Sequence, residues 1–316
     1  MEMTDSANME PAEKQAFEAE DLLCGISYAA FPISPIPAVN VATVPQRSPL
    51  RYPGGKTWLV PHIRKWLGAT EQPARLLVEP FAGGGIVSLT AVMEHMADRS
   101  IMAELDRDVA AFWHAALHHG PELRQKVLGF EPTRENVEAL ACVCPSSVVD
   151  HGFRTLVLNR TRRGGILAAG ASLSRVGENG KGVASRWYPN TIVDRLCEIA
   201  KHADRIGFCE TDGLKLLDAL LSIPDSGAAI FADPPYTAGG KRAGKRLYAH
   251  HSLDHAKLFS MLADSGVNFL MTYDAAEEII SLVRKHDFTA VQVMMKNTHH
   301  ARVPELVITR VPVFIQ

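Results

Sequence analysis

The sequence predicts an α/β fold in which parallel strands are joined by crossover helices. From residue 75 onward, short apolar runs alternate with segments of helical periodicity, which is the pattern of such folds. A glycine-rich turn follows the first of these apolar runs. The chain has 316 residues, of which 47% are hydrophobic and 22% are charged. We therefore expect one large domain, or a catalytic domain with a smaller one, and a core able to form a ligand cleft.

The expected elements follow one another along the chain. The expected strands cover 75–79, 100–104, 205–209, 228–232, 267–272, 290–295 and 305–315. The expected helices begin at 85, pass through 113–117, and cover 133–142, 191–203, 253–264 and 275–285. Residues 164–190 interrupt this alternation, because they are rich in Gly, Ser and Arg. They are expected to be an insertion of loops or a hairpin, where function is often located.

The N-terminal segment differs from the rest of the chain. Residues 1–46 are acidic and then proline-rich, without periodicity, and are expected to be a disordered tail. They carry seven acids and one base, so the net charge of −2 leaves −2 + 6 = +4 for the remainder. The acidic start is unlike a signal peptide, and prolines interrupt the apolar stretch 22–44. A cytoplasmic protein is expected, and its five cysteines, which form no CxxC pair, are expected to be buried reduced thiols.

Positive charge is concentrated in residues 151–190. Seven bases stand there against one acid, a net charge of 7 − 1 = +6. Taken alone, such a run is as often a solvated face as a functional surface. In an enzyme that acts on nucleic acid, it would be a surface that contacts phosphates.

The first chemical motif is the turn at residues 78–85, Val-Glu-Pro-Phe-Ala-Gly-Gly-Gly. Its glycines let the backbone turn sharply and approach a ligand between a strand and a helix. Neither GxGxxG nor GxxxxGK[ST] is present, so the usual dinucleotide and nucleoside triphosphate motifs are absent. Glu104 ends the next expected strand, where it could accept hydrogen bonds from both ribose hydroxyls of an adenosyl ligand. A solvated acid at a strand end is the alternative.

The second motif, Asp-Pro-Pro-Tyr at residues 233–236, is more specific. Two prolines fix φ and remove two backbone donors, so the turn is rigid and exposes carbonyl oxygens. A carboxylate and a carbonyl held in this way can accept both hydrogens of an exocyclic amine and direct its lone pair at an electrophile. Tyr236 could stack on an unpaired base. A plain turn at the end of a strand is the less favoured interpretation.

From about Ser48 to the C-terminus, the chain resembles the Dam-like (D12 class) adenine-N6 DNA methyltransferases. Residues 51–56, Arg-Tyr-Pro-Gly-Gly-Lys, are similar to the family's motif X, usually Lys-Trp-Ala-Gly-Gly-Lys, and precede the glycine-rich motif I as in the family. The resemblance implies a Rossmann-like S-adenosylmethionine-dependent methyltransferase fold with an inserted target-recognition region. It also implies S-adenosyl-L-methionine as the cofactor and no metal.

The resemblance assigns roles to individual residues. The implied cofactor-binding residues are Tyr52, Lys56, Glu79, Phe81, Gly83, Gly85, Glu104, Asp212 and Asp233. Of these, Tyr52 and Lys56 would contact the methionine end of the cofactor, with Glu79 near its amine. The implied catalytic residues are Asp233, Pro234, Pro235 and Tyr236.

The basic region is also similar to the family. Residues 158–165 resemble the start of the Dam-type target-recognition region, and 177–190 resemble its hairpin and exit. The family's Phe-Asn-Gly-Leu-x-Arg core is replaced by residues 164–168, which leaves the recognised DNA sequence open. The expected domains are the tail 1–46, a catalytic domain of 47–150 and 191–316, and a target-recognition insertion of 151–190. The expected DNA-binding residues are Arg160, Arg162, Arg163, Lys181, Arg186, Lys241 and Arg242.

The implied function is site-specific methyl transfer from S-adenosylmethionine to adenine N6 in double-stranded DNA, by base flipping and direct transfer. A monomer is expected, and a cognate restriction endonuclease is a candidate partner. The alternatives are an adenine methyltransferase of RNA or single strands, and a catalytically idle DNA-binding protein with the same fold. Cytosine-N4 transfer is less favoured, because that family generally has Ser at the position of Asp233. A nicotinamide oxidoreductase is least favoured.

Overall fold

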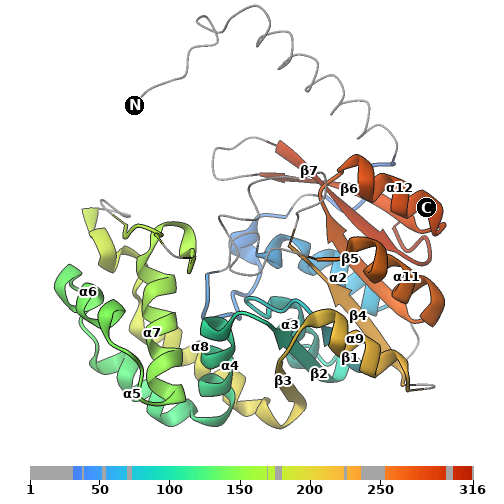
Figure 1. Ribbon diagram of the computed structural model, residues 1–316. Helices are drawn as coiled ribbons and strands as arrows, with labels where there is room; N and C mark the ends of the chain where they lie inside the picture. Colours follow the sequence, from blue (N-terminus) through green and yellow to red (C-terminus); the bar gives the residue numbers. More distant parts are fainter. Residues whose placement is uncertain are drawn as a thin grey trace, which may run out of the picture.

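The computed structural model describes residues 31–37, 39–51, 55–69, 73–168, 170–174, 180–223, 226–235, 253–296 and 302–314. Within these residues, seven strands form one sheet of order β3-β2-β1-β4-β5-β7-β6 (Figure 1). The strands are β1 (Ala74–Glu79), β2 (Ala97–Glu104), β3 (Ile206–Glu210), β4 (Ala228–Ala232), β5 (Asn268–Tyr273), β6 (Thr289–Lys296) and β7 (Arg302–Thr309). The first five are parallel, and β7 is antiparallel to both neighbours. The α/β fold expected from the sequence is confirmed.

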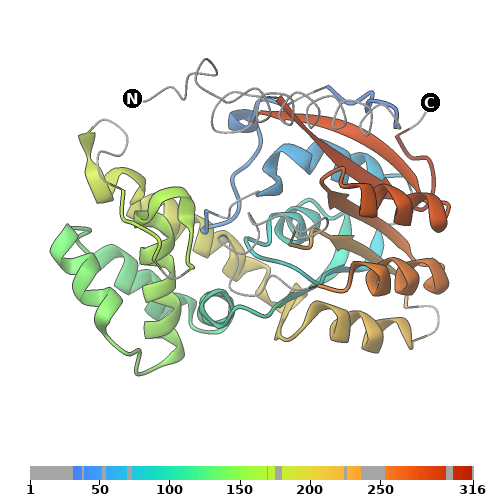
Figure 2. The same cartoon turned by 45° about the horizontal axis from the view of Figure 1, so that its top comes forward.

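Alternating side chains of the central strands pack on opposite faces of the sheet. Val78 of β1 and Ile230 of β4 join the apolar cluster beneath α9 (Gly213–Leu221), α11 (His255–Ser265) and α12 (Glu277–Lys285). Leu77 and Phe231 face the other way, against α2 (Val60–Leu67) and α3 (Ile86–Met93). All five residues of β4 are buried, as expected of a central parallel strand with helices on both faces (Figure 2).

A helical lobe lies between β2 and β3 in the chain. It consists of α4 (Arg107–His118), α5 (Gly120–Gly129), α6 (Arg134–Cys142), α7 (Val148–Thr161) and α8 (Pro189–Lys201), which are gathered beside the sheet in both ribbon views (Figures 1 and 2). Helix α7 packs closely on α4 at Gly152, where a Cβ atom would lie only 2.7 Å from the carbonyl oxygen of Ala111. The absence of a side chain at Gly152 allows this close approach. The lobe has its own apolar cluster around Trp113, Leu156 and Ile192.

Several elements differ from the expectations. Helices α2, α5, α7 and α9 were not expected, and the last strand ends at Thr309, not at 315. Residues 151–161, at the start of the expected insertion, are therefore helical. The loop character expected of 164–190 holds for the described residues up to 188, with 3₁₀ turns (Arg163–Gly165 and Gly182–Arg186) and a bridge between Arg162 and Leu173, whereas helix α8 already begins at Pro189.

Part of the expected N-terminal tail contacts the sheet, which corrects the expectation for residues 31–46. The backbone N–H of Ser34 donates to the carbonyl oxygen of Gln292 in β6 (2.8 Å), and Gln292 N–H donates to the carbonyl oxygen of Pro32 (2.8 Å). The Ser34 hydroxyl lies 2.9 Å from Nε2 of His62 in α2. The segment therefore pairs with the edge strand β6, a pairing that its high proline content concealed.

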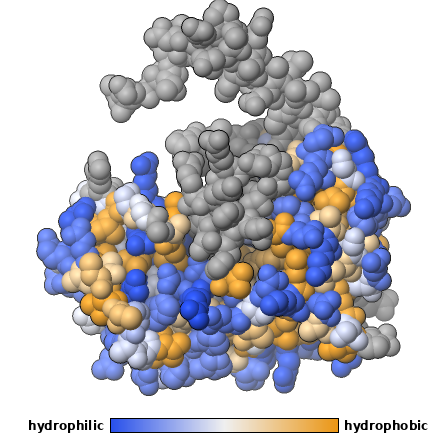
Figure 3. All heavy atoms as spheres, in the orientation of Figure 1, coloured by the Kyte–Doolittle hydropathy of each residue, from blue (hydrophilic) through white to orange (hydrophobic). Residues whose placement is uncertain are grey.

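The surface in view carries hydrophilic residues interspersed with small groups of apolar ones over both the lobe and the helices of the sheet (Figure 3). Among the described residues, no helix is long and apolar enough to cross a membrane. The described cysteines are free, but Cys142, Cys144 and Cys209 are exposed, so the expectation of buried thiols is wrong for these three.

Candidate active site

The carboxyl ends of β1 and β4 lie side by side, since the two strands pair from Leu76 with Ala228 to Val78 with Ile230. The chain order reverses between them, because β1 has β2 on its other side and β4 has β5. Open α/β sheets bind ligands at such a switch point. The glycine-rich turn follows β1 and Asp233 follows β4, so the fold brings the two motifs together.

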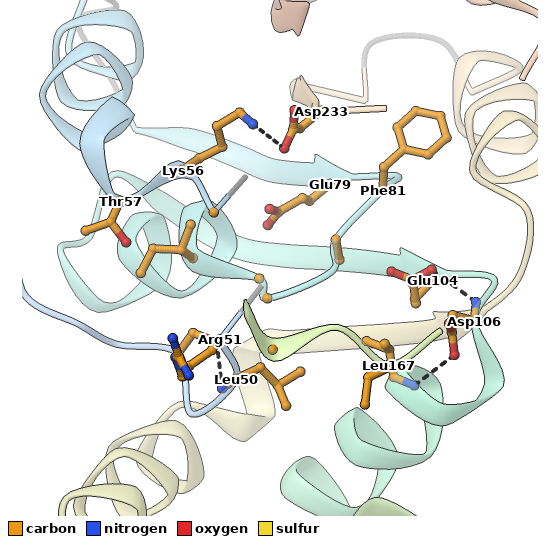
Figure 4. A pocket seen from close by; sticks show the side chains of 18 of the residues that line it. Leu50, Arg51, Lys56, Thr57, Glu79, Phe81, Glu104, Asp106, Leu167 and Asp233 are labelled. Carbon is orange, nitrogen blue, oxygen red and sulfur yellow. Dashed lines mark hydrogen bonds and ion pairs between the residues drawn. The ribbon is translucent and has the colours of Figure 1, made fainter. Parts of the chain in front are cut away.

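A cavity of about 630 Å³ opens at this edge of the sheet, a size typical of small-molecule sites. Side chains from the ends of neighbouring strands lie around it, with Asp233, Glu79 and Glu104 among them (Figure 4). Ten residues expected at the site line the cavity: Lys56, Glu79, Phe81, Gly85, Glu104, Arg160, Arg186, Asp212, Asp233 and Pro235.

The glycine-rich turn requires glycine at specific positions. Gly83 and Gly85 have φ values of 46° and 61°, in the left-handed region that other residues rarely adopt. A Cβ atom on Gly85 would also lie 2.8 Å from the sulfur of Met102 and from the ring of Trp113. The Trp113 Nε1–H donates to the carbonyl oxygen of Gly83 (2.9 Å), which fixes the turn against helix α4.

Glu104 is held at the end of β2 by three backbone N–H groups. Gly83 donates to its Oε2 atom (3.0 Å), and Leu105 and Asp106 donate to Oε1 (2.8 and 3.0 Å). Burial raises the pKa of Glu104 against the lowering effect of these bonds. A carboxylate has about four acceptor positions, so this one is oriented and keeps capacity for a hydroxyl donor.

Glu79, at the end of β1, is almost completely buried and accepts a hydrogen bond from the Ser88 N–H (2.8 Å). Burial raises its pKa to about 8, and the nearby Asp233 charge adds to the rise against the hydrogen bond from Ser88. The side chain is therefore largely protonated at pH 7. A cationic group in the cavity would favour its ionised form.

Asp233 is fixed by groups from two segments, the 3₁₀ turn Lys56–Leu59 and strand β5. Lys56 Nζ lies 2.8 Å from its Oδ2 atom, the ion pair drawn in Figure 4, and the Thr272 hydroxyl of β5 donates to Oδ1 (2.7 Å). Lys56 Nζ also lies 3.3 Å from Oε1 of Glu305 in β7. The side chains of Lys56 and Glu305 are almost fully buried. Both oxygens of Asp233 are thus engaged at the edge of the cavity, where Pro235 follows without an N–H donor.

A further wall of the cavity is formed by the start of α9. Asp212 caps this helix, because its Oδ1 atom accepts from the N–H groups of Leu214 and Lys215 (2.9 and 3.1 Å). A Cβ atom at Gly213 would lie 2.4 Å from the carbonyl oxygen of Pro80 and 2.7 Å from the Phe81 ring. The residues that follow β1, including Phe81, therefore pack closely on the start of α9 at Gly213, directly after Asp212.

Not all expected site residues gather at the cavity. Arg163 and Lys181 are exposed, and Nη1 of Arg162 donates to the carbonyl oxygen of Leu167 (2.9 Å). Arg160, expected to bind DNA, lines the cavity and is only 6% exposed, so it is not part of an exposed solvated face. Four expected residues lie outside the described part of the chain: Tyr52, Tyr236, Lys241 and Arg242. Among the described residues, His, Cys, Asp and Glu form no group of three that could hold a metal ion.

The cavity also includes residues that the sequence did not point to. Val41, Ala42 and Gln46 belong to the expected tail, and Arg195 is on helix α8. No pattern in the sequence distinguishes these positions. Arg51 also lines the cavity; it was given no role, although it is the first residue of the motif at residues 51–56.

The sequence matches no curated protein at a significant level. A candidate RNA methyltransferase from Pyrococcus horikoshii is similar in structure, with 10% identity, coverage of 93% of this chain and 99% of the other, and a TM-score of 0.36. The rRNA methyltransferase aviRa from Streptomyces viridochromogenes matches with 15% identity, coverage of 94% of each chain and a TM-score of 0.40.

The seven-stranded mixed sheet with its helical layers is an α/β fold. Residues 52–131 contain β1, the glycine-rich turn, β2, α4 and α5. Over these 80 of the 316 residues, the chain matches the D12 class N6 adenine-specific DNA methyltransferases, which confirms the resemblance for that segment.

Proposed function

We propose that this chain is an S-adenosylmethionine-dependent methyltransferase that modifies N6 of adenine in DNA. The observation that carries the proposal is the position of Asp233, fixed by Lys56 and Thr272, in the same cavity as the glycine-rich turn. A carboxylate there can accept hydrogen bonds from an exocyclic amine. The match of residues 52–131 supports adenine N6 and DNA over the alternatives.

The cavity residues fit S-adenosylmethionine, which would supply a methyl group on a sulfonium. Glu104 is oriented to accept from ribose hydroxyls, and the isolated buried Glu79 suits the ammonium of the methionine end. Phe81 and Asp212 would border the adenine end. Glu104 would gain hydroxyl donors and Glu79 would gain a cation, so both carboxyl groups suit the cofactor.

Asp233 would act on the target base. The adenine must leave the duplex to reach the cavity, and its amine would take the position on Oδ2 that Lys56 now holds. Lys56 would then remain paired with Glu305. Thr272 keeps the other carboxylate oxygen in place, so that the amine lone pair is directed consistently. Positioning and local hydrogen bonding would provide the rate enhancement.

We also propose that the target-recognition region lies within residues 151–190, on the helical lobe that borders the cavity. Helix α7 and the 3₁₀ turns carry Arg160 and Arg186 beside the cavity and Arg163 on the surface. Regions inserted beside a fixed catalytic site commonly carry specificity.

The direct test is to incubate the purified full chain with radiolabelled cofactor and, separately, plasmid DNA, single-stranded DNA and RNA, followed by nucleoside analysis. We expect N6-methyladenine in the duplex DNA. Asp233→Asn should abolish transfer, whereas Asp218→Asn, a matched change at an exposed position on α9, should leave it unchanged. Label only in RNA, or full activity in Asp233→Asn, would overturn the proposal.

A further inference from the structure

Four arginines from separate segments line the end of the cavity that faces the helical lobe. They are Arg51, Arg160 in the last turn of α7, Arg186 at the end of a 3₁₀ turn, and Arg195 in α8. In Figure 4, Arg51 lies across the cavity from Asp233. The other three cations act on Arg160. Burial, and then the charges of Arg195, Arg51 and Arg186, lower its pKa to about 9.

Arg160 is the unusual member of this cluster. Its residue surface is only 6% exposed, and its Nε atom is buried without a hydrogen-bond partner. Among the described residues, it forms no ion pair. A buried cation with no anion and three cationic neighbours is unfavourable unless a ligand supplies negative charge.

The cluster is held in place by its surroundings. The fully buried Asn159 side chain accepts from the Arg51 N–H (2.7 Å) and donates to the carbonyl oxygens of Arg51 (2.7 Å) and Gly165 (2.8 Å). Gly165 has φ = 75°, and a Cβ atom there would lie 2.2 Å from the Arg51 carbonyl oxygen. Arg195 Nη1 donates to the carbonyl oxygen of Ser48 (2.8 Å). Residues 48–51 are thereby held against the helical lobe at the cluster.

We infer that Arg51, Arg160, Arg186 and Arg195 form an oxyanion subsite that holds one phosphodiester group of the DNA strand carrying the target base. Guanidinium groups bind phosphate oxygens through paired N–H donors. The subsite shares the cavity with Asp233, so a phosphate held there would belong to a nucleotide close to the flipped base. The inference rests on the proposed function. The carboxylate of the cofactor's amino-acid end has the same oxyanion chemistry, and the test must distinguish these two sources.

The test compares Arg160→Met and Arg195→Gln with Arg284→Gln, which removes a cation from an exposed position on α12. We expect the first two variants to bind DNA at least about tenfold more weakly, with the dependence of log K on log salt reduced by about one ion. Their affinity for S-adenosylhomocysteine, measured by calorimetry, should match that of wild type and of Arg284→Gln. A tenfold loss of S-adenosylhomocysteine affinity with unchanged DNA binding would assign the subsite to the cofactor carboxylate and overturn the inference.

Two further measurements keep this test independent of folding and of the proposed function. Removing an uncompensated buried cation should leave the melting temperature of Arg160→Met unchanged or raise it, whereas a structural cation would lower it. Inorganic phosphate at constant ionic strength should raise the melting temperature of wild type but not of Arg160→Met. If wild type methylates DNA and both variants bind it normally, only the inference fails. If wild type transfers no methyl group to DNA but shows the Arg160-dependent phosphate effect, only the proposed function fails.

Discussion

The pH dependence of cofactor binding follows from the environment of Glu79. This carboxyl is almost completely buried, and its pKa is raised to about 8. We expect it to face the ammonium of the methionine end, which binds the ionised form better than the neutral acid. Affinity should therefore rise as the pH rises towards 8, in the direction opposite to that expected if Glu79 acted as a neutral donor.

The size of the effect follows from the pKa of about 8. At pH 6 roughly 1% of Glu79 would be ionised, and at pH 8 about half. If only the ionised form binds the ammonium well, the dissociation constant should fall by up to about 50-fold between these pH values, or about 2 kcal/mol. Binding at pH 7 should also release close to one proton.

The assay is calorimetric titration with S-adenosylhomocysteine, which carries the same ammonium group and undergoes no reaction. Titrations in two buffers of different ionisation enthalpy give the number of protons released. Glu79→Gln is the control, because it keeps the size of the side chain and removes the titration. Its affinity should be weak and nearly independent of pH. A wild-type dissociation constant that stays constant from pH 6 to 8 would refute the assignment of Glu79 to the ammonium.

Three other predictions concern stability and are measured by denaturant or thermal unfolding. Lys56→Met should lower the free energy of unfolding by about 3–5 kcal/mol, because it leaves the carboxylates of Asp233 and Glu305 without their shared cation. Adding Glu305→Gln should recover part of this loss, and no recovery would argue against the shared pairing. Gly165→Ala should lower the free energy of unfolding by more than the ~1–3 kcal/mol typical of backbone strain, because the added Cβ would meet the Arg51 carbonyl oxygen. Gly170→Ala, at φ = 83° with open space around it, should show the strain alone, and equal losses in the two variants would contradict the close contact with Arg51. Burial and the Lys65 charge lower the pKa of His62 to about 4. Wild type should therefore lose stability as the pH falls from 6.5 to 4, by up to about 1.4 kcal/mol per pH unit. His62→Gln should remove this contribution, and an identical pH profile in the variant would show that His62 is not responsible.

The sheet was predictable because its strands are short apolar runs with little competition from other patterns. The buried run Ala228–Ala232, ended by Asp233 and two prolines, was expected at the residues where β4 occurs. The antiparallel position of β7 was not predicted, since strand direction depends on long-range pairing that leaves no mark on local periodicity. Helix α7 was missed for a different reason. It is buried on several sides, so its apolar residues do not form a single stripe.

The site was predictable where a motif and the topology combine, and not where distant segments meet. Glu79, Glu104 and Asp233 each end a parallel strand, so the switch-point rule places them near one another once the strands are recognised. Arg195 and residues 41–46 reach the cavity only through the packing of α8 and of the N-terminal segment. Tertiary contacts of this kind depend on the whole fold, and the local sequence carries no trace of them.

The three carboxylates at the strand ends differ chiefly in what neutralises them, and this difference separates their proposed roles. Asp233 has a cation, Lys56, within 2.8 Å, and Glu104 has three N–H donors. Glu79 has one N–H and no ion-pair partner among the described residues. Asp233 can accept from an amine donor while Lys56 stays close by on Glu305, so its negative charge keeps a cation in the vicinity. A carboxyl whose pKa burial raises to about 8, as in Glu79, is mostly neutral at pH 7, and an arriving cation favours its ionised form. The same edge of the sheet can therefore keep a ready acceptor for the base beside a carboxyl that ionises with its ligand.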